Sequence, residues 1–366
     1  MAYQSLYRRY RPRRFSEVRG QDHVTRALRN AVRDGTVAHA YLFSGPRGTG
    51  KTSTARILAK ALNCAAPVDG EPDCTCESCR SVEAGTSYDL HELDAASNNS
   101  VNDVRDLIAK AALATPGREK VYILDEVHML SGAAANALLK TLEEPPAHVT
   151  FVLATTDPRK VLPTIRSRCQ HHEFHLLPAD ELDAHVRWVA ADAGLEVDDA
   201  DVAAVVRQGG GSARDTLSAL ELVVAAGGAA EDVAAADELV ESLCERDTGR
   251  ALAAVEEAVR AGQDPRELGA AVIRRLRDAF LAELGADLSH LPGPDRDRAL
   301  DQGKRLGRAL AVRSLEVLGE ALVEIHKKLD ARIALEVALV RLTRPEADAS
   351  PAALLDRIER LERRLA

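Results

Sequence analysis

The sequence predicts an α/β domain with a parallel sheet flanked by helices, followed by smaller domains that are purely helical. Across the first 176 residues, short apolar runs alternate with amphipathic segments. Such alternation is typical of a parallel sheet with helices on both faces. After Pro178 the strand signals end and Ala-rich helical patterns replace them. Because a chain of 366 residues is longer than one hydrophobic core usually accommodates, two or three domains are expected.

Four apolar runs in the first part are predicted to be buried strands. They are AYLFS at 40–44, DLHEL at 89–93, VYILD at 121–125 and VTFVLA at 149–154. Helical patterns lie between them, for example at 52–62 and 136–143. The pair Pro145-Pro146 is expected to end the second of these helices, because proline cannot continue a helix.

Glycine and proline clusters predict how the helical part is divided. Breaks are expected at 209–211 and 227–228, and a loop at 291–295. The expected boundaries are 1–177 for the α/β domain, 178–242 for a small helical domain, 243–345 for a helical bundle and 346–366 for a tail. The tail carries apolar residues at helical spacing, namely Leu354, Ile358, Leu361 and Leu365. Because it is too short for a coiled coil, it is interpreted as an amphipathic helix or the start of a linker.

Composition excludes some classes of protein. Apolar residues make up 46% of the chain and charged residues 29%, which fits a folded protein rather than a disordered one. A net charge of −9 argues against a protein that coats nucleic acid through its overall charge. The N-terminus has no apolar signal core, and no apolar run is long enough to span a membrane. The expected location is therefore the cytoplasm, with no membrane partner.

Residues 45–52, with the sequence GPRGTGKT, fit the pattern of a phosphate-binding loop between a strand and a helix. Its glycines let backbone N–H groups curl around phosphates at the positive end of the helix. Lys51 is expected to reach the β and γ phosphates, and Thr52 to bind Mg²⁺. The alternative is a Gly-rich turn that merely opens a helix. The context on both sides favours a site for a nucleoside triphosphate.

The predicted strand at 121–125 ends in two carboxylates, Asp125 and Glu126. Asp125 is expected to hold Mg²⁺ through water, and Glu126 to polarise the attacking water. An acidic pair after a strand is often only the start of a loop. On a parallel strand downstream of a phosphate loop, it instead predicts hydrolysis.

Four of the six cysteines crowd together, at Cys64, Cys74, Cys76 and Cys79. In a reducing compartment such a cluster indicates metal ligation before disulfides. Four thiolates at short range suit a closed tetrahedral Zn²⁺ site, which would be structural. The alternative is a set of free buried cysteines. Cys169 and Cys244 are expected to be isolated and inert.

Longer stretches around these motifs resemble the clamp-loader gamma/tau family of AAA+ ATPases. They are DEVHML at 125–130, NALLKTLEEPP at 136–146, ATTDP at 154–158 and SRC at 167–169. The resemblance runs through the first 225 residues and continues more loosely through the rest. It implies an AAA+ ATPase domain with a zinc module, then a helical lid and a helical collar.

The resemblance also implies roles for particular residues. The phosphate loop would comprise Gly45, Pro46, Arg47, Gly48, Thr49, Gly50, Lys51, Thr52 and Ser53. The adenine would be lined by Tyr7, Tyr10, Arg11, Pro12, Val18 and Gly20. Thr156, with Thr155 as the alternative, would sense the γ-phosphate, Arg214 would reach the nucleotide of its own subunit from the lid, and Arg168 would be an arginine finger in the neighbouring subunit's site. From chemistry alone, a solvated residue or a salt-bridge partner is the more common role for each arginine.

The four-cysteine zinc module of the family lies at this same place, after the phosphate-loop helix. The family has two Cys-x-x-Cys steps in a row, whereas a single residue separates Cys74 from Cys76 here. This departure from the family pattern counts against Cys74 as a zinc ligand.

The partners implied are delta-type and delta-prime-type subunits, copies of the chain itself, a sliding clamp and primer–template DNA. The family's task is ATP-driven loading of the clamp during DNA replication by DNA polymerase III. A basic strip near the N-terminus, comprising Arg8, Arg9, Arg11, Arg13 and Arg14, is expected against the nucleotide and a neighbouring subunit. The segment 97–100, before the helix with Arg105, is the better candidate for DNA backbone contact, with an ordinary N-cap as the alternative.

Three other functions fit the sequence less well. A P-loop kinase fits the Asp-Glu pair and the SRC segment poorly. A non-catalytic clamp-loader scaffold is disfavoured by the intact Lys51 and Glu126. A branch-migration helicase lacks the cysteine module, so zinc content distinguishes it.

Overall fold

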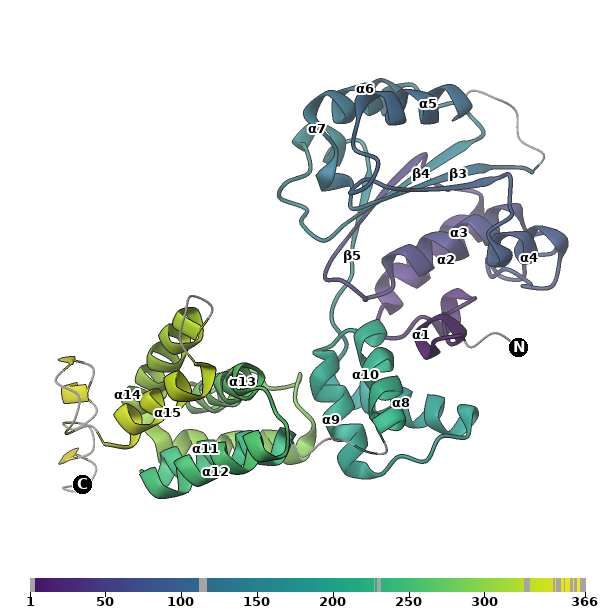
Figure 1. The fold of residues 1–366 in the computed structure, drawn as a ribbon. Helices are drawn as coiled ribbons and strands as arrows, with labels where there is room; N and C mark the ends of the chain where they lie inside the picture. Colours follow the sequence, from purple (N-terminus) through teal and green to yellow (C-terminus); the bar gives the residue numbers. More distant parts are fainter. Residues whose placement is uncertain are drawn as a thin grey trace. The chain divides into compact units, whose positions relative to one another are not determined.

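A computed structural model of the chain forms two compact units, which are described separately (Figure 1). Unit 1 comprises Met1–His185 and Gly209–Ala219, and unit 2 comprises Val186–Gln208 and Leu220–Ala366. The structure describes residues 4–111, 117–226, 228, 232–325, 330–344, 346, 350–351, 353–355, 358 and 361–362. The division between the units falls within α8 (Ala179–Ala193) and α10 (Ala213–Ala226), and it also separates the last residue of α9 (Asp199–Gly209), Gly209, from the rest of that helix.

Unit 1 is built on a five-stranded sheet in the order β2-β3-β4-β1-β5, with every pair of neighbours parallel. The strands are β1 (Ala40–Ser44), β2 (Leu90–Asp94), β3 (Lys120–Asp125), β4 (Val149–Thr155) and β5 (Gln170–Glu173). The first four confirm the predicted strands to within one residue at each end. The fifth, a polar strand that pairs only with β1 at one edge, is absent from the sequence prediction.

Helices cover both faces of this sheet (Figure 1). The helices up to β5 are α1 (Leu6–Arg9), α2 (Asp22–Asp34), α3 (Lys51–Asn63), α4 (Glu77–Ala84), α5 (Val101–Ala111), α6 (Gly132–Glu143) and α7 (Pro163–Arg166), with 3₁₀ turns η1 (Phe15–Glu17) and η2 (Val127–Met129); those that pack on the sheet are identified by the apolar clusters. One apolar cluster joins α2 and α3 to the sheet, with Leu28, Ile57 and Phe43 fully buried. Another joins α5, α6 and α7 to the opposite face. Because all neighbouring strands are parallel, their carboxyl ends lie at the same edge of the sheet. Ligands of open α/β sheets bind at this edge.

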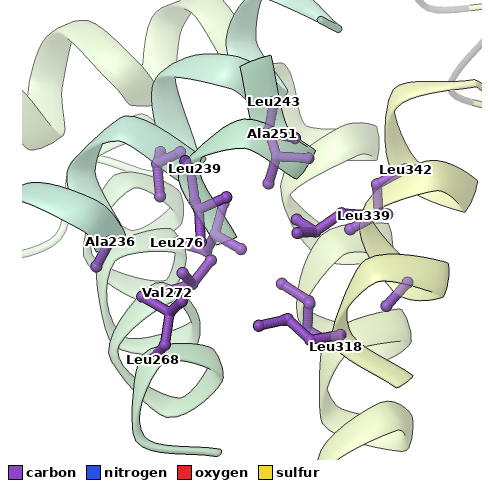
Figure 2. Close-up of a cluster of buried hydrophobic side chains, with 14 of the residues drawn as sticks. Ala236, Leu239, Leu243, Ala251, Leu268, Val272, Leu276, Leu318, Leu339 and Leu342 are labelled. Carbon is purple, nitrogen blue, oxygen red and sulfur yellow. The ribbon is translucent and has the colours of Figure 1, made fainter. Parts of the chain in front are cut away.

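Unit 2 is helical and has its own apolar core. Its elements are α9 (Asp199–Gly209), α11 (Asp232–Glu245), α12 (Thr248–Arg260), α13 (Pro265–Glu283), α14 (Gly293–Ile325) and α15 (Ala331–Thr343). Figure 2 shows how Leu239, Leu276 and Leu339, from three of these helices, converge on one cluster. Leucines at helical spacing explain this packing, because each helix presents one apolar stripe.

The predicted loop at 291–295 is shorter than expected, because α14 already begins at Gly293. Pro294 and Asp295 occupy the first turn, where a missing N–H costs nothing and a carboxylate is favoured. The helix is interrupted at Gly307, whose φ of 74° is left-handed. In the tail, Leu354, Ile358 and Leu361 are exposed, and Leu365 lies outside the described residues.

A buried ion cluster ties α9 to the other helices of unit 2. Asp295, only 4% exposed, accepts Arg207 at 2.8 Å and lies 3.3 Å from Arg275. Arg275 also pairs with Asp237 at 2.7 Å, and Arg298 pairs with Asp237 at 2.5 Å. Removing one member of such a cluster leaves buried charge uncompensated.

Asp295→Ala is therefore expected to lower the free energy of unfolding of unit 2 by about 3 kcal/mol. Urea unfolding followed by the fluorescence of Trp188, the one tryptophan of the chain, reports on this unit. The control is Asp301→Ala, whose pair with Arg305 lies at the surface and is worth at most about 1 kcal/mol. Equal midpoints for both variants would contradict a structural role for the cluster.

Across the described parts of the chain, no helix combines the length and the apolar character needed to cross a membrane.

Candidate nucleotide-binding site

A cleft of about 930 Å³ lies in unit 1 at the carboxyl edge of the sheet. Its size is in the range of pockets that bury small-molecule ligands. The predicted residues that line it are Tyr7, Tyr10, Arg11, Pro12, Val18, Arg47, Gly48, Thr49, Gly50, Lys51, Thr52, Ser53, Asp125, Glu126 and Arg214. The chain thus brings most of the predicted nucleotide residues to one cavity.

The loop before α3 has the conformation that the phosphate motif predicts. Gly45, Gly48 and Gly50 have φ values of 139°, 76° and 101°, which side chains other than glycine rarely adopt. Lys51 begins α3 and is buried, and its Nζ donates to the carbonyls of Gly45 and Pro46, both at 2.7 Å. Burial lowers the pKa of Lys51, against a smaller opposite effect of Glu126 and Asp125. Gly45 and Pro46, which are not among the described residues that line the cleft, therefore hold the Lys51 side chain through their carbonyl groups.

The end of β3 supplies the two predicted carboxylates. The Thr52 hydroxyl donates to Asp125 at 2.8 Å, so the two predicted Mg²⁺ ligands already touch. Glu126 Oε2 accepts the hydroxyl of Thr156 at 2.9 Å and the backbone N–H of Thr156 at 3.1 Å. Thr156 is not among the described residues that line the cleft, and it contacts the cleft through its hydrogen bonds to Glu126, which does line it. Thr155, the alternative, is fully buried and hydrogen-bonds His128 at 2.9 Å.

The N-terminal segment forms another wall of the cleft. Arg11 donates to the Ser53 hydroxyl at 2.9 Å, and burial lowers the pKa of its guanidinium to about 10, so it stays charged at neutral pH. Tyr7 faces the Arg214 guanidinium, 4.9 Å from its ring centroid, in a cation–π contact. Gly20 is absent from the described residues that line the cleft. It lies beside Leu177, which does line it.

The start of α10 closes in on the phosphate loop. A Cβ on Gly48 would lie 2.0 Å from the Ser212 hydroxyl and 3.2 Å from Cβ of Arg214. Glycine at position 48 therefore permits both a left-handed backbone and close approach of the Arg214 segment. This close approach is consistent with Arg214 being one of the residues that line the cleft.

Arg168, the predicted finger, points elsewhere. It follows α7, is partly exposed, and pairs with Glu143 at 2.6 Å while donating to the Thr164 carbonyl at 2.8 Å. Among the described residues, it is not one that lines the cleft of its own chain.

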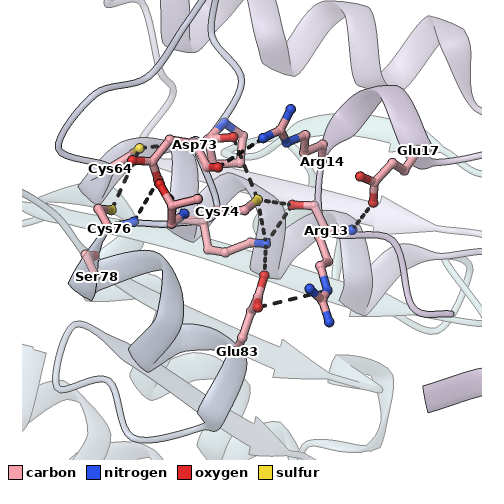
Figure 3. A network of polar contacts seen from close by, with 12 residues as sticks. Arg13, Arg14, Glu17, Cys64, Asp73, Cys74, Cys76, Ser78 and Glu83 are labelled. Carbon is pink, nitrogen blue, oxygen red and sulfur yellow. Dashed lines mark hydrogen bonds and ion pairs between the residues drawn. The ribbon is translucent and has the colours of Figure 1, made fainter. Parts of the chain in front are cut away.

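The cysteine cluster forms a compact donor set next to the N-terminal segment (Figure 3). Donor atoms of Cys64, Cys76, Cys79 and Asp73 lie within 4.8 Å of one another. Cys74, predicted as a ligand, is outside this group, and Asp73, which the sequence prediction did not include, is part of it. The sequence spacing could have indicated Asp73, because positions 73, 76 and 79 are each three residues apart, as in two successive Cys-x-x-Cys steps.

The module is bonded to the segment that lines the cleft. Glu71 accepts the backbone N–H groups of Phe15 at 2.8 Å and Ser16 at 2.9 Å. Lys60 of α3 donates to the Arg13 carbonyl at 2.6 Å and pairs with Glu83 of α4 at 3.0 Å. These bonds connect α3, the cysteine module and the N-terminal wall. Outside the module, burial raises the pKa of Cys169 and of Cys244 to about 12.

The candidate for DNA contact begins α5 with a reciprocal cap. The Ser100 hydroxyl and N–H both donate to Asp103, at 2.6 and 3.1 Å, and Asp103 N–H returns a bond at 3.3 Å. Asn98 donates to the Asp94 carbonyl at 3.1 Å. This arrangement is a capping box with aspartate in the acidic position. The ordinary N-cap, the alternative interpretation of this segment, is therefore present.

Sequence reasoning missed other residues that line the cleft. Arg56 lies one helical turn beyond Thr52 on α3 and pairs with Glu92 of β2 at 2.5 Å. Leu177, His185 and Leu217 line the cleft with side chains that no short motif marks.

Comparisons with known proteins agree with these features. A family model described as "DNA polymerase III, delta subunit" matches residues 20–178, and one described as "DNA polymerase III subunits gamma and tau domain III" matches residues 228–358. The chain is 44% identical over 382 residues to DNA polymerase III subunit gamma/tau of Mycobacterium tuberculosis (strain ATCC 25618 / H37Rv), covering 99% of this chain and 66% of that protein. It is 36% identical over 389 residues to DNA polymerase III subunit tau of Bacillus subtilis (strain 168), covering 99% and 68%. For subunit tau of Escherichia coli (strain K12), the identity is 37% over 358 residues, with 93% and 55% covered. The chain therefore spans about two thirds of the length of these relatives, or less.

Proposed function

The chain belongs to the DNA polymerase III gamma/tau family, and from this premise we propose that it is the ATP-hydrolysing subunit of a clamp loader. In this proposal, ATP binding organises an assembly that opens a sliding clamp. Primed DNA then triggers hydrolysis, and the closed clamp is released on DNA during replication. The observation that carries the proposal is the single cleft formed by the phosphate loop, the Asp125-Glu126 pair and Arg214.

ATP binds with its phosphates on the loop at 45–52. Lys51 leaves the carbonyls of Gly45 and Pro46 and donates to the β and γ phosphates, a stronger, charge-assisted interaction. Thr52 and Asp125, which already contact each other, would hold Mg²⁺, and the ion would offset the negative charge of the phosphates. Tyr7, Tyr10 and Val18 bound the part of the cleft assigned to the adenine.

Glu126 orients and polarises the water that attacks the γ-phosphate. Its Oε2 is occupied by Thr156, which fixes the carboxylate and leaves the second oxygen for water. Arg214 stabilises the phosphate charge within the same subunit. Arg168 does so in the site of a neighbour, so hydrolysis depends on assembly.

The partners proposed are delta-type and delta-prime-type subunits, further copies of this chain, the sliding clamp and primer–template DNA. The helices at 243–345 form the collar through which subunits assemble, and 178–242 form the lid. The start of α5 contacts the DNA backbone by hydrogen bonds from Asn98 and Ser100. Contacts of this kind release few counterions, so DNA affinity should fall only weakly with salt.

The cysteine cluster is proposed to hold a structural Zn²⁺. Zn–S bonds of about 2.3 Å in a tetrahedron bring sulfurs to about 3.8 Å from one another. Sγ of Cys76 lies 4.0 Å from Sγ of Cys64, so the residues fit the ion with little movement. The ion would stabilise the module that supports the N-terminal wall of the cleft.

Lys51→Ala is expected to weaken ATP binding by the purified chain at least about 10-fold, because a hydrogen bond to a charged group is worth about 1.5–3 kcal/mol. Isothermal titration with ATP and Mg²⁺ measures this affinity. The control is Lys160→Ala, which removes an exposed lysine paired only with Asp157. Unchanged affinity in Lys51→Ala would exclude the cleft as the nucleotide site.

A further inference from the structure

We infer that the carboxylate of Asp73, rather than the thiolate of Cys74, is the fourth ligand of the metal site. The site would then consist of three thiolates and one carboxylate. This inference rests on the proposal that the cluster binds zinc, and it concerns which residues of this chain do so.

The positions of the donor atoms support Asp73. A carboxylate oxygen of Asp73 lies close to the sulfurs of Cys64, Cys76 and Cys79. Each of these four atoms is within 4.8 Å of the other three. Cys64 and Cys79 are buried, so the ion would be shielded on the protein side. The backbone N–H of Asp73 also donates to Sγ of Cys64 at 3.3 Å, a bond that supports a thiolate.

The carboxylate of Asp73 is held in place from the other side. Its Oδ1 accepts the backbone N–H groups of Thr75 at 2.9 Å and Cys76 at 3.1 Å. Ligating carboxylates are commonly fixed by such outer hydrogen bonds. One carboxylate therefore both shapes the turn that delivers Cys76 and points into the donor set.

Cys74 faces away from the donor set (Figure 3). Its φ of 61° lies in the left-handed region, which turns its side chain out of line with that of its neighbour. Sγ of Cys74 lies 3.3 Å from the Arg13 carbonyl and 3.5 Å from Nζ of Lys60. Those contacts join the turn to the N-terminal segment and to α3. Bringing Cys74 to the metal would break them and would displace Asp73.

The chemistry of such a set is compatible with zinc. Zinc accepts Cys thiolates at about 2.3 Å and carboxylate oxygens at about 2.0–2.2 Å. Exchanging one thiolate for one carboxylate keeps the total ligand charge. Three thiolates still favour a soft-ligand metal over Mg²⁺ or Ca²⁺. The shorter Zn–O bond suits a residue whose backbone already contacts Cys64.

Three variants test the assignment on the full chain. Asp73→Asn keeps an oxygen for the Thr75 and Cys76 N–H groups but loses the anionic ligand, so zinc affinity should fall at least about 10–100-fold. Cys74→Ser should retain one zinc per chain with unchanged affinity. Asp73→Cys should retain the metal and gain a fourth thiolate. Zinc content is measured by mass spectrometry, and affinity by competition with a chromophoric chelator.

Cobalt substitution counts the thiolates directly. In the wild-type chain loaded with Co²⁺, the thiolate-to-metal charge-transfer band should correspond to three sulfurs. It should grow by about one third in Asp73→Cys and stay constant in Cys74→Ser, because intensity follows the number of Co–S bonds. The increase of the band in Asp73→Cys tests the assignment even if Asp73→Asn fails to fold.

The outcomes separate the two proposals. A wild-type chain that binds neither zinc nor Co²⁺ would overturn the metal site itself. A metal-loaded wild type with a four-thiolate band, which Cys74→Ser reduces, would overturn Asp73 alone. A band that Asp73→Cys leaves unchanged would do the same.

Discussion

Replacing Arg168 with alanine is expected to lower the ATP turnover of the assembled clamp loader by about 10³-fold or more, the effect typical of a lost arginine finger. The side chain is absent from the described lining of its own cleft and is held by Glu143 and the Thr164 carbonyl. Because a pair between partly exposed groups is worth at most about 1 kcal/mol, the guanidinium can leave Glu143 for a phosphate at little cost.

The isolated chain should behave differently from the assembly. Arg168→Ala should bind ATP with unchanged affinity, because its own cleft is intact. The matched control is Arg166→Ala, which removes an exposed arginine two residues earlier, at the end of α7. Steady-state turnover of complexes built with each variant gives the comparison. Wild-type turnover in complexes of Arg168→Ala would exclude the finger.

Glu126→Gln should lower turnover by about 10³-fold, within the range for loss of general base catalysis, and should leave ATP affinity nearly unchanged. Glutamine keeps the shape of the side chain and an oxygen that can accept from Thr156. What it loses is the basic oxygen that polarises water. The left-handed φ of Glu126, 49°, shows that the backbone is committed to this orientation.

Two further variants define the origin of the effect. Glu144→Gln, an exposed glutamate at the end of α6, should turn over ATP like the wild type. Thr156→Val removes the hydroxyl that holds Glu126 and should reduce turnover less than Glu126→Gln does. Rates are measured in single-turnover experiments, which separate chemistry from product release. If Glu126→Gln hydrolysed ATP at the wild-type rate, another base would have to be sought.

The sheet core was predictable because its strands are apolar runs. β1 and β4 are buried along their whole length, and the runs at 40–44 and 149–154 mark them within one residue. The edge strand β5 has the sequence QHHE and three exposed residues of four, so hydrophobic periodicity gives no sign of it. It exists because β1 offers a free edge, which is a tertiary effect.

The candidate site divides in the same way. Lys51, Thr52 and Asp125 were predictable, because a fixed spacing of residue types serves a fixed chemistry. The contact of Arg11 with Ser53 and the place of Leu177 in the cleft depend on long-range packing. Asp73 was not expected in the donor cluster because the prediction rested on the cysteines alone, whereas the turn places its carboxylate beside the sulfurs of Cys64, Cys76 and Cys79.

Steady-state ATP turnover of the purified chain, alone and then with delta-type partner subunits, sliding clamp and primed DNA, tests the central claim most directly. Turnover should be low for the chain alone, since each cleft lacks a neighbour's Arg168, and should rise when clamp and primed DNA are added to the complex. Turnover that ignores partners, clamp and DNA would contradict the proposed function, even if the chain hydrolysed ATP efficiently.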